Sequence, residues 1–122
     1  MFEDTTLPIY MQIATLIEDE ILNNTFSTGD RVYSTNELSK LYTVNPATAG
    51  KGLNILIEEG ILYKKRGVGM FVTQNAYQII QEKRSKAFMN SSILSLIQEA
   101  IQLGIDKKTL LKMIEQYPWK EA

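Results

Sequence analysis

The sequence predicts a mainly α-helical chain with one small β-hairpin. Apolar residues recur at helical spacing over most of the 122 residues, two helix-start signals stand close together, and two short segments of β-forming residues flank a glycine-containing turn. A chain of this length predicts one compact core with an appended element rather than two full domains.

The first helix is expected from Pro8 onward and should end near Asn24. Its apolar positions fall at helical spacing: Ile9, Ile13, Leu16, Ile17 and Ile21. The following segment, TFSTGDRV, provides turn chemistry around Gly29 and then a short extended piece. The chain is therefore expected to reverse direction there.

A second, short helix is predicted to begin after Ser34. The run from Ser34 to Glu37 is an S-x-x-E capping box, in which the two side chains satisfy each other's backbone amides. Tyr33 and Leu38 hold the positions of a hydrophobic staple. The helix should continue through Tyr42.

A third helix is predicted over about residues 46–59, and the stretch TVNPATAGKGLNIL (43–56) contains its start. Asn45 is a strong N-cap, Pro46 suits the first helical position, and Gly60 suits the residue beyond the end. Four apolar residues form one stripe along this helix: Ala49, Leu53, Leu56 and Ile57. Two helices joined by a turn of about three residues are typical of a helix-turn-helix.

The segments ILYKK and GMFVT predict a hairpin whose turn contains Arg66, Gly67, Val68 and Gly69. Helix, short strand, helix, helix, strand, strand is the order of a winged helix-turn-helix. We therefore expect a DNA-binding domain of this kind over residues 1–74 and an all-α helical tail over residues 75–122.

The tail is predicted to contain three helices. The first runs from about Asn75 to Phe88, and the second is capped near Asn90 or Ser91 and stops at Gly104. The third has Asp106 as its N-cap, with Ile105 and Leu110 as a staple, and ends at Pro118. A hairpin of this size cannot bury its own apolar side chains, so a homodimer is expected to cover Ile93, Leu94, Ile97, Ile101, Leu110, Leu111 and Ile114.

The composition excludes most catalytic chemistry. The chain has no cysteine and no histidine, which removes thiolate and imidazole metal sites and the Ser-His-Asp and Cys-His nucleophile systems. The acidic residues are expected on solvated helix faces. We predict no enzyme activity, no catalytic residue, no metal site and no cofactor. Since no apolar run approaches ~18 residues and the start MFEDTT is acidic, we expect neither a membrane span nor a signal peptide, and hence a cytoplasmic protein.

The AGKG sequence within the third helix also suggests a phosphate-binding loop. That loop needs Gly, four residues and then Gly-Lys-Ser/Thr after a strand, whereas a helix start precedes Gly50, and Gly52-Leu53 stands where the magnesium-binding hydroxyl belongs. The two glycines each cost roughly 1 kcal/mol in a helix. We expect Gly50 to allow close approach of DNA and Gly52 to allow tight packing of another helix.

A DNA-binding face is favoured by position rather than by total charge. The net charge is −1, with net −3 over residues 1–74 and net +2 over residues 75–122. The start of the third helix nevertheless presents Ala47, Thr48 and Lys51 away from its apolar stripe. The hairpin adds Lys64, Lys65 and Arg66, and further cations of the same face are Arg31 and Lys40.

The order of elements and several short motifs resemble the N-terminal domain of GntR-type bacterial transcriptional regulators. The resemblance covers Leu7 to Val72, and its marks are PIYMQI, GDRVYSTNELS, VNPAT, EEGIL and RGVGMFV. The short helical tail is similar to that of the YtrA-like subgroup, whose small C-terminal part serves dimerisation.

The resemblance implies a homodimeric repressor that binds a palindromic operator in double-stranded DNA and controls its own operon and a neighbouring transporter operon. It implies DNA contacts at Ser34, Thr35, Asn36, Asn45, Ala47, Thr48, Lys51, Arg66, Gly67 and Gly69. The family usually has Pro-Ser-x-Arg where this chain has Tyr33 to Asn36, so asparagine replaces an arginine that normally contacts DNA. The operator sequence therefore does not follow from the family pattern.

Two other classes of function are compatible with parts of the sequence. A winged helix can serve as a protein-protein adaptor or an RNA-binding module, because the fold does not fix its partner. An enzyme is disfavoured for want of a site. The tail is too small to enclose a drug-sized cavity within one subunit, so any small-molecule effector, whose identity is unknown, is expected to bind between subunits or between the tail and the DNA-binding domain.

Overall fold

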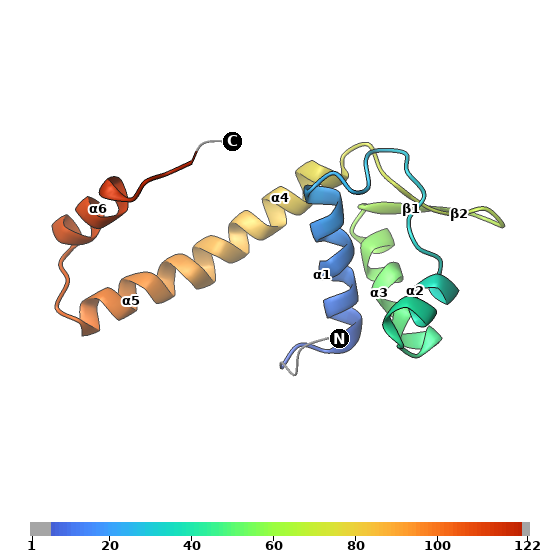
Figure 1. The fold of residues 1–122 in the computed structure, drawn as a ribbon, viewed down its shortest axis with the longest axis horizontal. Coiled ribbons are helices and arrows are strands. Elements are labelled where there is room, and N and C mark those ends of the chain that lie inside the picture. Colours follow the sequence, from blue (N-terminus) through green and yellow to red (C-terminus); the bar gives the residue numbers. More distant parts are fainter. Residues whose placement is uncertain (1–5, 121–122) are drawn as a thin grey trace. The chain divides into compact units, whose positions relative to one another are not determined.

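The computed structural model describes residues 6–120 (Figure 1). The chain divides into two compact units, of which the first ends at Lys83 and the second begins at Arg84. The first unit thus reaches beyond Gln74, the last residue of the expected DNA-binding domain, because the first turns of α4 (Ala76–Ala87) bury Ala76 and Ile80 in its core. Among residues 6–120, no helix combines the length and apolar character that crossing a membrane requires.

The first unit consists of three helices and a hairpin, followed by the start of α4. The helices are α1 (Ile9–Leu22), α2 (Thr35–Tyr42) and α3 (Pro46–Glu58), and the strands are β1 (Leu62–Lys65) and β2 (Gly69–Val72). Their apolar faces form one core, whose largest fully buried side chains are Ile13, Ile17, Leu38, Leu53, Leu56, Ile61, Leu62 and Ile80. This confirms the expected mainly α fold with a small hairpin.

The helix starts that position the candidate site follow from local sequence. Ser34 Oγ accepts a hydrogen bond from the Glu37 amide (3.1 Å), and Glu37 Oε1 accepts one from the Ser34 amide (2.9 Å), so the predicted capping box is present. Asn45 caps α3 by accepting a hydrogen bond from the Ala47 amide (2.9 Å), with Pro46 at the first position. These caps confirm the predicted boundaries.

The hairpin is supported by a third segment. β1 and β2 pair antiparallel, with Leu62 opposite Val72 and Lys65 opposite Gly69. The backbone around Arg31 adds a bridge to Phe71, and the Val32 amide donates to the Met70 carbonyl (2.8 Å). A two-stranded hairpin alone is marginally stable, so this bridge and the buried Val72 anchor its base.

Contrary to expectation, not all acidic residues of α1 lie on a solvated surface. Glu18 is only 3% exposed, and its carboxylate is paired with the ammonium of Lys83 from α4. Lys83 Nζ also lies 2.9 Å from Glu59 Oε1 at the end of α3. Glu20 Oε2 accepts a hydrogen bond from the Tyr33 hydroxyl (2.7 Å). The expectation was wrong for Glu18 because a buried carboxylate is tolerated once a cation compensates its charge.

The second unit contains a helical run and one further helix. α4 continues through a π-helical segment, η1 (Phe88–Ile93), into α5 (Leu94–Gln102), and α6 (Lys107–Gln116) follows after a turn at Gly104. Asp106 caps α6 as predicted, accepting from the Thr109 amide (2.8 Å).

The predicted helix start near Asn90 or Ser91 is wrong. The backbone at Ala87, Ile93 and Leu94 is right-handed helical, and no side-chain cap begins η1 or α5. Asn90 and Ser91 are exposed, so their side chains do not need to cap, and their weak helix preference is insufficient to break the run. A wider π turn accommodates the segment instead.

Candidate nucleic-acid interface

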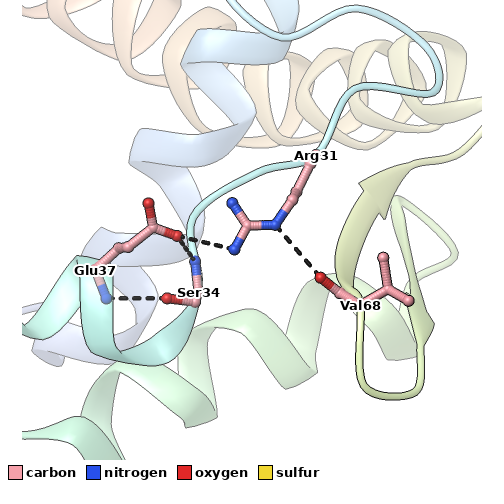
Figure 2. A network of polar contacts seen from close by, with 4 residues as sticks. All are labelled: Arg31, Ser34, Glu37 and Val68. Carbon is pink, nitrogen blue, oxygen red and sulfur yellow. Dashed lines mark hydrogen bonds and ion pairs between the residues drawn. The ribbon is translucent and has the colours of Figure 1, made fainter.

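The residues predicted to contact DNA lie at three places of the first unit: the start of α2, the start of α3 and the hairpin, here called the wing (Leu62–Val72). A Cβ built on Gly50 of α3 would lie 3.9 Å from Thr35 Oγ1, so the first turns of α2 and α3 are neighbours. Arg31 connects the start of α2 with the wing (Figure 2). The start of α2 thus lies beside α3 and is linked through Arg31 to the turn of the wing.

Most of these residues are exposed to solvent. Those exposed are Asn36, Asn45, Ala47, Lys51, Lys64, Lys65, Arg66 and Gly67, and those partly buried are Ser34, Thr35, Thr48 and Gly69. Ser34 and Asn45 already use a side-chain oxygen for helix capping. The Asn45 amide group nevertheless remains chemically able to donate to phosphate.

Lys51 and Lys65 are held against aromatic rings. Lys51 Nζ lies 4.0 Å from the ring centroid of Tyr10 in α1. Lys65 Nζ lies 4.8 Å from the centroid of Phe71, which stacks on Tyr63 at 5.7 Å. An ammonium over a ring keeps its charge while its side chain is ordered. Both cations therefore have a preferred position before any partner arrives, which sequence spacing did not indicate.

Arg31 lies between α2 and the wing (Figure 2). Its Nε donates to the carbonyl oxygen of Val68 in the turn of the wing (3.4 Å), and its Nη2 lies 3.3 Å from Glu37 Oε1. From the sequence, Arg31 is expected only as one of several cations and Glu37 only as a capping residue. The capping box predicts a contact between Ser34 and Glu37, but it does not predict the ion pair between Arg31 and Glu37.

The electrostatics of the α2 start follow from this network. Hydrogen bonds from Ser34, first from its backbone amide and then from its side chain, lower the pKa of the Glu37 carboxyl, and the charge of Arg31 adds to the effect. Glu37 is therefore ionised near neutral pH. A carboxylate thus lies among the cations of this face.

The chemistry offered by this surface is anion binding. Ammonium, guanidinium, hydroxyl and amide groups are donors suited to phosphate oxygens and base edges. Within the part of the chain that the structure describes, no cluster of three or more acidic side chains could hold a metal ion.

Six of the seven residues predicted for dimerisation line one apolar groove of the second unit, between α5 and α6. The groove has a volume of about 430 Å³, and its predicted members are Ile93, Ile97, Ile101, Leu110, Leu111 and Ile114. Leu94, the seventh, is half-exposed and does not line it. Leu96, Ala100, Ile105 and Lys107 also line the groove and were not predicted for dimerisation, although the helical spacing of Leu96 and Ala100 relative to Ile97 and Ile101 was readable.

Fold and surface together define a winged helix-turn-helix protein of the DNA-binding class. Residues 9–72 match the family described as "Bacterial regulatory proteins, gntR family", and since this span is more than half of the chain, the protein belongs to the GntR family. It is a transcriptional regulator with a DNA-binding domain. The resemblance inferred from the sequence motifs is thereby confirmed.

Relatives and solved structures agree with this assignment. "HTH-type transcriptional repressor YtrA" of Bacillus subtilis is 28% identical over 112 residues, covering 92% of this chain and 85% of that protein. A GntR family transcriptional regulator from Listeria monocytogenes has a TM-score of 0.76 at 30% identity, covering 94% of this chain and 98% of that chain. These relatives are named as regulators of transcription, in agreement with the expectation that the protein is not an enzyme.

A DNA complex is among the similar structures. The DNA-binding domain of AraR, solved in complex with operator ORR3, is 27% identical with a TM-score of 0.55, and the match covers 60% of this chain and 88% of that chain. The similarity is thus to a DNA-binding domain in complex with an operator.

Proposed function

We propose that the protein is a homodimeric repressor that binds a palindromic operator in double-stranded DNA. The observation that carries the proposal is the shared face formed by the start of α2, the start of α3 and the cationic wing, on a chain of the GntR family. Its targets are its own operon and a neighbouring transporter operon, such as an ABC transporter operon. It acts in the cytoplasm, where bacterial DNA lies.

Each element has a distinct part in operator binding. The start of α3 enters the major groove, where Ala47, Thr48 and Lys51 reach base edges or phosphates. The start of α2 lies across the backbone with Ser34 and Thr35. The wing places Lys64, Lys65 and Arg66 along phosphates or in a minor groove, and Gly67 at its exposed turn leaves room for close approach.

A second copy of the chain is the proposed cover for the apolar groove. Within one chain the groove leaves large side chains in contact with solvent: Ile101 is 70% exposed and Leu111 54%. Burying apolar surface contributes about 25 cal/mol per Å², so an exposed groove of this kind favours association. A twofold dimer presents two copies of α3 to half-sites about one DNA turn apart.

Repression is proposed because YtrA, which matches nearly the whole chain, is named a repressor. A dimer on an operator that overlaps a promoter excludes polymerase from it. Control of its own operon is inferred from the family resemblance.

Footprinting of the region upstream of the protein's own gene tests this function. The expected result is a protected palindrome whose half-sites lie about one helical turn apart. Affinity for that duplex should fall steeply between about 50 and 200 mM salt, because bound phosphates release counterions. No protected region, or an affinity nearly independent of salt, argues instead for an adaptor or RNA-binding role.

A further inference from the structure

The side chain of Arg31 packs against Gly69, in space that a side chain at position 69 would occupy. Gly69 has φ +146°, and a Cβ built on it would lie 2.8 Å from Arg31 Nε and 3.4 Å from Arg31 Cγ. A side chain at position 69 would require Arg31 to move from this place. The glycine therefore makes room for Arg31, a role different from the close DNA approach expected of it.

The partners of Arg31 hold its guanidinium loosely. The Nε to Val68 carbonyl distance is 3.4 Å and the Nη2 to Glu37 distance is 3.3 Å, both long for charge-assisted hydrogen bonds. The side chains of Arg31 and Glu37 are 48% and 49% exposed. An exposed ion pair of this kind contributes little to stability, so replacing one of its members costs little free energy.

We propose that Arg31 binds a DNA phosphate where α2 meets the wing, and that Glu37 occupies the place of that phosphate while the protein is free of DNA. The inference rests on the proposed operator binding. It adds Arg31 as a phosphate contact and the replacement of Glu37 by phosphate when DNA binds. The geometry supports it because Arg31 adjoins two DNA-facing elements at once (Figure 2). A guanidinium presents five donors in a fork, so it can keep the Val68 carbonyl while turning its terminal nitrogens to a phosphate.

Glu37 has the chemistry of a stand-in for phosphate. Its carboxylate is fixed by the Ser34 amide, so it offers an anionic oxygen at a defined place. When DNA arrives, the phosphate takes over the Arg31 contact and Glu37 keeps its bond to Ser34. The capping box thus persists while the ion pair is replaced.

Salt-dependent binding of the full-length protein to the footprinted duplex tests the exchange. Arg31→Ala is expected to weaken binding about tenfold and to reduce the slope of log affinity against log salt by about 1 per subunit. Arg31→Lys should keep the slope, because it keeps the charge. Glu37→Gln, which retains a capping-box residue, should tighten binding about two- to fivefold because the competing carboxylate is gone.

The matched control is Lys108→Ala, which removes the same charge from α6 of the second unit. It should leave the slope unchanged, and an equal change in both variants would show a bulk charge effect and overturn the inference. Weaker binding by Glu37→Gln, with an unchanged melting temperature, would also overturn it. If the parent protein binds with a steep slope and Arg31→Ala shares that slope, the inference alone fails. If the parent does not bind, the proposed function fails with it.

Discussion

Gly52 of α3 lies directly against the backbone of Tyr10 in α1. A Cβ at position 52 would be 2.8 Å from the Tyr10 carbonyl oxygen and 3.0 Å from Ile13 Cγ2. Backbone cannot move aside as a flexible side chain can, so the two helices approach closely only because residue 52 is glycine. This bears out the expectation that Gly52 permits tight helix packing.

Substituting the two glycines of α3 should therefore have opposite effects on stability. Gly52→Ala is expected to lower the free energy of unfolding by about 1–3 kcal/mol, because the methyl group overpacks the contact between α1 and α3. Gly50→Ala should raise it by about 1 kcal/mol, since its Cβ meets only Thr35 at 3.9 Å and alanine favours the helix. Urea denaturation of both variants measures the difference, and equal effects would contradict it.

Loss of the Lys83 ammonium should destabilise the first unit through Glu18. Lys83→Met removes the cation beside a carboxylate whose side chain is 4% exposed, so about 1–3 kcal/mol of stability should be lost, less than for a fully buried pair because Lys83 is 41% exposed. The double variant Lys83→Met with Glu18→Gln should recover part of the loss. Glu59→Gln serves as the control with the smaller effect, since its side chain is 33% exposed.

A structural feature could be predicted from the sequence when the contact that determines it joins residues close together in the chain. The caps at Ser34, Asn45 and Asp106 were predictable because each involves residues two or three positions apart. The burial of Glu18 was not, because its partner Lys83 is 65 positions away. For the same reason the contact of Arg31 with Val68, 37 positions apart, could not be deduced. The expected break near Ser91 failed where a local polar signal was too weak to end a helix.

Operator binding should depend on the start of α3 and on the wing. Lys51→Ala and Arg66→Ala are each expected to weaken binding to the footprinted duplex about tenfold, since each removes a charge-assisted contact. Fluorescence anisotropy at fixed salt measures the affinity, and sedimentation should show an unchanged oligomeric state. If both variants bind like the parent, DNA contacts a different face.

A charge placed in the apolar groove should dissociate the proposed dimer. Ile97→Glu brings a carboxylate into a surface that the partner chain would desolvate, so the variant is expected to sediment as a monomer. Gln98→Glu, which adds the same charge at the next, exposed position of α5, should remain a dimer. A parent that sediments as a monomer at every concentration would remove the basis for this prediction.

Acid should weaken the start of α6 through Asp106. Hydrogen bonding to Thr109 lowers the pKa of the Asp106 carboxyl below its ordinary 3.8. A carboxyl whose pKa is lower in the folded state stabilises that state above its unfolded pKa, and this contribution disappears as pH falls through the folded value. Asp106→Asn keeps a capping oxygen that does not titrate, so its unfolding free energy should decline less than the parent's below about pH 4. Denaturant unfolding across this pH range measures it.

The residues that anchor the base of the wing differ from the exposed cations near its turn. Val72 is buried, and the amides of Val32 and Val72 are bonded to Met70 and Asp30 across the base of the hairpin. Lys64 and Arg66 near its turn are exposed. Mutations near the turn can thus accumulate over generations without unfolding the domain. Regulators that diverge after gene duplication can therefore change the charge and shape of this turn while inheriting the same scaffold.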